Sequence, residues 1–137
     1  MAQTPDAPTL LDALARFLGE QVQPAIADPR LGFRVRVATY LAGVLAREAR
    51  LGPRHAADEA ARLAGLLGRE APPPGGPPFD AWLAEANRAL ASALRDATLP
   101  PEQAGAARAH LFATLREALA ISQPGFDLRL DVERPPD

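Results

Sequence analysis

Two arginines in the stretch "RVATYLAGVLARE" are the residues best placed to bind an anion. Arg36 and Arg47 stand 11 positions apart, and on an α-helix this separation returns to within about 20° of the same direction. Tyr40 and Gly43 fall on the strip between them, where the glycine leaves room for a ligand, another helix or a partner's side chain. Because a guanidinium can donate two parallel hydrogen bonds to a carboxylate or a phosphate, this strip is a candidate ligand site.

Two further polar side chains are candidates for the same kind of contact. Glu48 directly follows Arg47, and Asn87 borders the apolar stripe of a later helix. A buried amide needs hydrogen-bond partners, so Asn87 either holds two helices in register or contacts a ligand. The arginines also have a structural interpretation, in which each lays its apolar stem on a helical bundle and pairs with a carboxylate from another helix.

The sequence offers little for catalysis or for metal binding. His55 shares a helical face with Asp58 and Glu59, but His110 is the only other histidine, and the chain has no cysteine and no lysine. The Glu-x-x-His pairs typical of di-iron bundles do not occur. We therefore expect no catalytic residue, no metal and no cofactor. The net charge of -2 gives no electrostatic reason to bind nucleic acid or an anionic membrane.

The first residues show no basic region followed by an apolar run, so they do not resemble a secretory signal. The longest uncharged apolar stretch, "VATYLAGVLA", is far shorter than the roughly 20 residues of a membrane span. The expected location is the cytoplasm.

Apolar periodicity predicts an all-α, single-domain bundle. Thr9 resembles a helix N-cap with Asp12 reaching back to it, and Asp28-Pro29 resembles a second helix start. Gly52-Pro53 and Gly68 are typical helix ends. The predicted helices span residues 9–22, 29–51, 54–67, 79–97 and 101–122.

The second predicted helix carries two apolar stripes, which places it at the centre of the bundle. A helix that is apolar on more than one side is typically buried on more than one side. One stripe consists of Leu31, Val35, Ala38, Leu41, Ala42 and Leu45, and the adjoining stripe consists of Phe33, Val37, Tyr40 and Val44.

Residues 1–137 are expected to form one domain with a disordered start (1–8), a Pro/Gly linker (71–78) and an extended tail (124–137). Residues 126–133, "FDLRLDVE", alternate apolar and charged side chains, as half-buried strands do. Three interpretations remain open for this segment. It lies in a groove of its own bundle, it pairs with its own copy or with another protein's sheet edge, or it is disordered.

Four stretches occur in an order that resembles a family of small bacterial helical proteins of unknown function. They are "LLDALARFLGEQVQPAI", "FRVRVATYLAGVLARE", "LAEANRALASALRD" and "LREALAISQPGF", and together they cover roughly Leu10 to Phe126. Members of that family are often encoded beside aminoglycoside-phosphotransferase-like kinases and acyl-CoA dehydrogenases. The resemblance implies no catalytic residue.

The chain departs from the family's pattern at Tyr40, where asparagine is expected. It departs again at "QPGF", where an Asn-Pro ending with a basic residue and tyrosine is expected. Both differences weaken any ligand site shared with the family near the second and fifth predicted helices. The expected function is that of a non-enzymatic accessory protein of a kinase or acyl-CoA enzyme system, which self-associates or binds a phosphotransferase-like or acyl-CoA dehydrogenase-like partner. The alternative is a binder or modifier of a small anionic ligand, such as an acyl-CoA or a phosphorylated metabolite, through Arg36 and Arg47.

Overall fold

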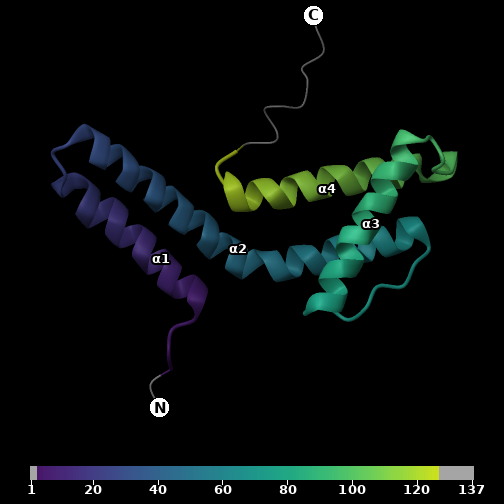
Figure 1. Cartoon of the computed structure of the whole chain (residues 1–137), viewed down its shortest axis with the longest axis horizontal. Helices are drawn as coiled ribbons and strands as arrows, with labels where there is room; N and C mark the ends of the chain where they lie inside the picture. Colours follow the sequence, from purple (N-terminus) through teal and green to yellow (C-terminus); the bar gives the residue numbers. More distant parts are fainter. Residues whose placement is uncertain (1–2, 127–137) are drawn as a thin grey trace, which may run out of the picture.

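The computed structural model describes residues 3–126, which fold into four α-helices and no strand. The helices are α1 (Ala7–Phe17), α2 (Pro29–Leu67), α3 (Pro77–Arg95) and α4 (Ala104–Ser122). Figure 1 shows α2 running the length of the molecule, with α1 along its first half and α3 and α4 against its second half. The all-α prediction is confirmed, whereas the predicted number of five helices is wrong.

The second and third predicted helices are one continuous helix, because Gly52-Pro53 does not end α2. Proline removes the hydrogen bond to the carbonyl of Ala49 and crowds that carbonyl with its ring. The residue before a proline normally clashes through its Cβ, and Gly52 has none. Gly52 therefore permits the helix to continue through the proline, although the cost of the lost hydrogen bond remains. Figure 1 shows α2 bending near its middle, as helices do at proline.

Replacing Pro53 with alanine is expected to stabilise the protein by about 1 kcal/mol. The full penalty for proline inside a helix is about 3 kcal/mol, but proline also restricts the unfolded chain, which offsets part of it. Urea unfolding measures the difference. The control is Pro73→Ala in the exposed linker, which should not stabilise the protein. A Pro53→Ala variant no more stable than this control would contradict the prediction.

The first helix begins earlier than predicted, at Ala7, inside the segment expected to be disordered. Its N-cap is Asp6, whose Oδ1 accepts a hydrogen bond of 2.9 Å from the Thr9 N–H. Thr9 is therefore not the cap, because Pro8 fits the first helical turn and lets the helix start before it. Asp12 does not reach back to Thr9 and forms instead a 2.7 Å ion pair with Arg50 of α2.

After Phe17 the chain widens into a π-helical turn, η1 (Leu18–Val22), and then tightens into a 3₁₀ turn, η2 (Gln23–Ala25). At Gly19 an added Cβ would lie 3.2 Å from Cγ2 of Thr39. The π-helical turn therefore lies directly on α2, and the regular α-helix predicted over residues 9–22 ends at Phe17.

The outer ends of α2 agree with the prediction. Asp28 accepts a hydrogen bond of 3.0 Å from the Arg30 N–H, and Gly68 ends the helix in the left-handed conformation with φ of 61°. Pro77 and Pro78, assigned to the linker, form the first turn of α3. The last predicted helix begins with a 3₁₀ turn, η3 (Pro101–Gln103), before α4.

The core is small and lies where the second half of α2 meets α3 and α4. Its buried members are Leu63, Leu66, Ala86, Leu90 and Ala107. Side chains packed against it are half-buried, among them Trp82 and Leu83 of α3. No helix among residues 3–126 has the length and hydrophobicity required to cross a membrane.

Residues 7–50, which we call the arm, comprise α1, η1, η2 and the first part of α2, and they have almost no core. In this segment only Ala42 and Ala46 are buried. The two stripes predicted to be buried are largely uncovered. The arm's large hydrophobic side chains that are at least 40% exposed are Leu10, Leu14, Phe17, Leu31, Phe33, Val37, Tyr40, Leu41 and Leu45.

Candidate functional site

Tyr40 and Arg47 meet at the C-terminal end of α4. Nε of Arg47 donates a hydrogen bond of 2.6 Å to the Ile121 carbonyl, and the Tyr40 hydroxyl donates one of 3.0 Å to the Ser122 carbonyl. The last carbonyls of a helix lack partners within the helix, and a cation there complements the helix dipole. Both side chains therefore cap α4 from α2.

Gly43 makes room for Arg47 itself. A Cβ built on Gly43 would lie 3.2 Å from Nη1 of Arg47, so the guanidinium folds back over the glycine one turn earlier. The space expected to accept a ligand is thus occupied by the arginine of the same helix.

The other predicted site residues lie apart from this cap. Arg36 and Glu48 are exposed on α2, and the unbroken helix keeps Arg36 on the same face as Arg47. Asn87 lies on α3, where its Nδ2 donates to Oε1 of Glu59 at 2.9 Å and to the Leu83 carbonyl at 3.1 Å. The structure brings Tyr40 and Arg47 together, and Asn87 instead tethers α3 to α2.

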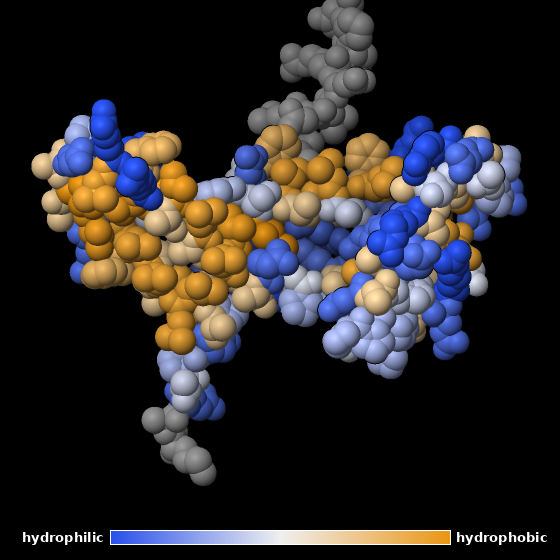
Figure 2. Space-filling model, viewed as in Figure 1, coloured by the Kyte–Doolittle hydropathy of each residue, from blue (hydrophilic) through white to orange (hydrophobic). Residues whose placement is uncertain are grey.

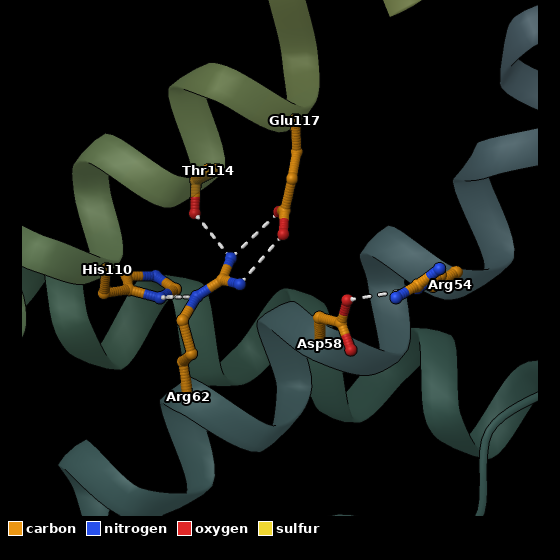
Figure 3. A network of polar contacts seen from close by, with 6 residues as sticks. All are labelled: Arg54, Asp58, Arg62, His110, Thr114 and Glu117. Carbon is orange, nitrogen blue, oxygen red and sulfur yellow. Dashed lines mark hydrogen bonds and ion pairs between the residues drawn. The ribbon is translucent and has the colours of Figure 1, made fainter. Parts of the chain in front are cut away.

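A polar network that we did not predict from sequence is centred on Arg62, between α2 and α4 (Figure 3). Its Nη1 and Nη2 donate to the two carboxylate oxygens of Glu117, each at 2.9 Å. Nη2 also donates to Oγ1 of Thr114 at 3.3 Å, and Nε donates to Nδ1 of His110 at 3.1 Å. One guanidinium thus binds three side chains of α4.

A sequence signal for this network exists in the spacing of polar residues. His110, Thr114 and Glu117 follow the i, i+4, i+7 pattern of one helical face. On α2, His55, Glu59 and Arg62 have the same i, i+4, i+7 spacing. Two polar stripes of equal spacing therefore face each other, but only the packing of α2 on α4 pairs them.

The network shifts the protonation of its members. Burial, together with the positive charge of Arg62, lowers the pKa of His110. The hydrogen bonds from Arg62 lower the pKa of Glu117, and the same bonds raise the pKa of Arg62. Because Nδ1 of His110 accepts from Arg62, the neutral imidazole carries its proton on Nε2. Arg62 and Glu117 thus form an ionised pair, and His110 beside them is neutral.

A groove of about 410 Å³ adjoins the network. Small residues line much of it, including Ala61, Gly65 and Ala106, beside Gln103 and His110. Oε1 of Gln103 is buried and has no hydrogen-bond partner among the described residues. Within residues 3–126, no cluster of three histidine or carboxylate side chains could hold a metal ion. The arrangement is suited to fix α4 on α2.

Residues 24–126 match the family described as a domain of unknown function, DUF6285. The chain belongs to this family. No curated protein and no solved structure matches it. The DUF6285 region contains α2, α3, α4 and the whole Arg62 network, whereas α1 precedes it.

The stability of this DUF6285 protein is expected to fall as the pH drops below about 6.5. The pKa of His110 is below its ordinary value of 6.5 in the folded state, so the unfolded chain takes up the proton first and is favoured by acid. A second loss follows below 4.5, because the pKa of folded Glu117 lies under that value. Each proton contributes at most about 1.4 kcal/mol per pH unit.

Urea unfolding at a series of pH values measures both losses. The control is His110→Gln, whose amide oxygen can still accept from Arg62 but does not titrate. We expect this variant to lack the first loss and to keep the second. Identical pH profiles of the variant and the natural protein would contradict the assignment to His110.

Proposed function

We propose that the protein is a non-enzymatic interaction protein, an accessory component of a kinase or acyl-CoA enzyme system in the cytoplasm. The observation that supports this proposal is the amount of large apolar side chain left uncovered by the fold. The arm is one such surface. The outer face of α4 is a second, where Leu111, Phe112 and Leu115 are 50–54% exposed.

Exposed apolar side chains are ordinary when scattered, but a contiguous patch marks an interaction surface. Figure 2 shows hydrophobic residues gathered over α1 and the first half of α2, and a separate group along α4. Aromatic residues, which are enriched at protein interfaces, occur on both surfaces, as Phe17 and Phe33 on the arm and Phe112 on α4.

The resemblance to proteins encoded beside phosphotransferase-like kinases and acyl-CoA dehydrogenases supplies the choice of partner. The α4 face offers one surface for it, because Leu111 and Leu115 lie one turn apart with Phe112 beside them. Arg108 and Arg116, both exposed, border this face. A partner would cover the apolar centre and leave the arginines at the rim.

Co-expression with each enzyme encoded beside the gene tests the proposal. The tagged full chain should co-purify with one of them in a fixed ratio, and Leu115→Glu should abolish the complex. Arg116→Glu, the matched control beside it, should leave the complex intact. Failure of every neighbouring enzyme to co-purify would overturn the accessory role.

A second candidate function, binding of a small anion, is supported by the arginines of α2. Nε of Arg47 donates to the Ile121 carbonyl of α4, whereas within residues 3–126 the two Nη atoms of Arg47 form no hydrogen bond. Arg36 is exposed on the same helical face. A thermal-shift screen with CoA esters and nucleotides should show stabilisation that Arg36→Ala/Arg47→Ala removes. An equal shift in the variant would exclude this site.

A further inference from the structure

We propose that the arm pairs with the arm of a second copy of this chain, with the two α2 helices antiparallel and Leu41 at the twofold axis. The inference rests on the proposed function, since it names one partner of an interaction protein. It concerns the arm alone and leaves the α4 face to other partners.

The arm cannot form a core by itself. In the helical wheel of α2, Val35, Thr39, Ala42 and Ala46 fall on one side, where Thr39 approaches Gly19 and the two alanines are buried. Val37, Leu41 and Leu45 fall on another side and are 40–54% exposed. A helix apolar on two sides is typically covered on both, and α1 covers only one.

The surface that the fold leaves open, on the arm and on the α4 face together, is large enough to include an obligate dimer interface. The whole chain exposes 10095 Å². The 13 residues outside the described part would expose about 2000 Å² as an unfolded chain. Subtracting this area leaves about 8000 Å² for residues 3–126. A compact monomer of about 13 kDa exposes about 6300 Å². Two copies thus have an excess of about 3400 Å², and obligate dimers bury about 2000–5000 Å².

The charges along this stripe favour a second copy over an unrelated partner. Arg34, Leu41 and Glu48 are each seven positions apart and therefore share one face of α2. Arg34 and Glu48 are both exposed, and the apolar side chains of Val37 and Leu45 lie between them and Leu41. The stripe has a cation at one end, an anion at the other and apolar residues between.

Antiparallel pairing about Leu41 makes such a stripe complementary to itself. A twofold axis brings the same patch of both copies together, so Arg34 of each copy lies opposite Glu48 of the other. Leu41 packs on its own copy, and Val37 packs near the partner's Leu45. With α1 of each copy alongside, the two arms form a four-helix bundle, in which each helix buries its apolar face.

Light scattering and sedimentation of the full chain test the pairing. The particle mass should be twice the 14.5 kDa of the chain. Arg34→Glu places two like-charged pairs across the axis and should raise the dimer dissociation constant at least tenfold, as should Glu48→Arg. The exchange Arg34→Glu/Glu48→Arg restores opposite charges and should return the constant to within about threefold of the natural value. A monomeric natural protein, or an exchange that fails to restore the dimer, would overturn the proposal.

A cysteine placed at the axis gives an independent measurement, because the chain has no cysteine of its own. Leu41→Cys should cross-link to its own copy through a short bismaleimide. Leu94→Cys, on an α3 leucine with 42% exposure, is the matched control and should remain uncross-linked. Equal cross-linking of the two variants would also overturn the pairing.

The accessory role and the arm pairing can each be refuted without the other. A monomer that still co-purifies with a neighbouring enzyme refutes the arm pairing and keeps the accessory role. A dimer that binds none of those enzymes refutes the accessory role and keeps the pairing.

Discussion

Replacement of Leu63 with alanine is expected to lower the free energy of unfolding by about 3 kcal/mol. Leu63 has no exposed surface and is the largest fully buried side chain among residues 3–126. It lies in the cluster that joins α2 to Ala86 and Leu90 of α3 and to Ala107 of α4. Truncating a buried leucine costs about 2–5 kcal/mol, through lost burial and the cavity left behind. With so few core residues, the chain has little reserve against this loss.

Urea unfolding followed by circular dichroism measures the difference. The chain concentration must be equal for all variants, because self-association would add concentration-dependent stability. Leu94→Ala is the matched control, since Leu94 is 42% exposed and its truncation should cost less than about 1 kcal/mol. A Leu63→Ala variant no less stable than this control would contradict the position of the core.

Replacement of Arg62 with methionine is expected to cost about 2–3 kcal/mol. Methionine fills a similar volume but donates no hydrogen bond. The carboxylate of Glu117 would lose both of its donors from Arg62, and Nδ1 of His110 would lose its donor. Breaking a buried ion pair from one side costs about 3–5 kcal/mol. The side chains of Arg62 and Glu117 are 26% and 19% exposed, so water recovers part of this cost.

The surface pair of Arg88 with Glu85 is the control, with side chains 71% and 61% exposed. Arg88→Met should cost less than about 0.5 kcal/mol, because an exposed ion pair contributes little. Adding Glu117→Leu to Arg62→Met should recover part of the loss, since it removes the unpaired carboxylate. Equal effects of Arg62→Met and Arg88→Met would refute a stabilising role for the network.

The candidate site was only partly predictable from the sequence. The 11-residue spacing of Arg36 and Arg47 predicted a common helical face, and the unbroken α2 keeps them on one. The target of Arg47 was not predictable, because the Ile121 carbonyl is 74 positions away in the chain. For the same reason the role of His110 was not predictable, because it accepts a hydrogen bond from a residue 48 positions earlier. The alternating pattern of residues 126–133 predicted an extended tail. Beyond Phe126 these residues lie outside the part of the chain that the structure describes.

The sequence by itself determined the helical class and the helix ends that local hydrogen bonds control. Asp28 and Gly68 bound α2 because a cap acts within a few residues of itself. Only the tertiary structure decided that α2 continues through Pro53, that Arg62 binds Glu117, and that the arm's apolar stripes stay open. These outcomes depend on contacts between helices far apart in the chain, whose energies outweigh the local preference of a single residue.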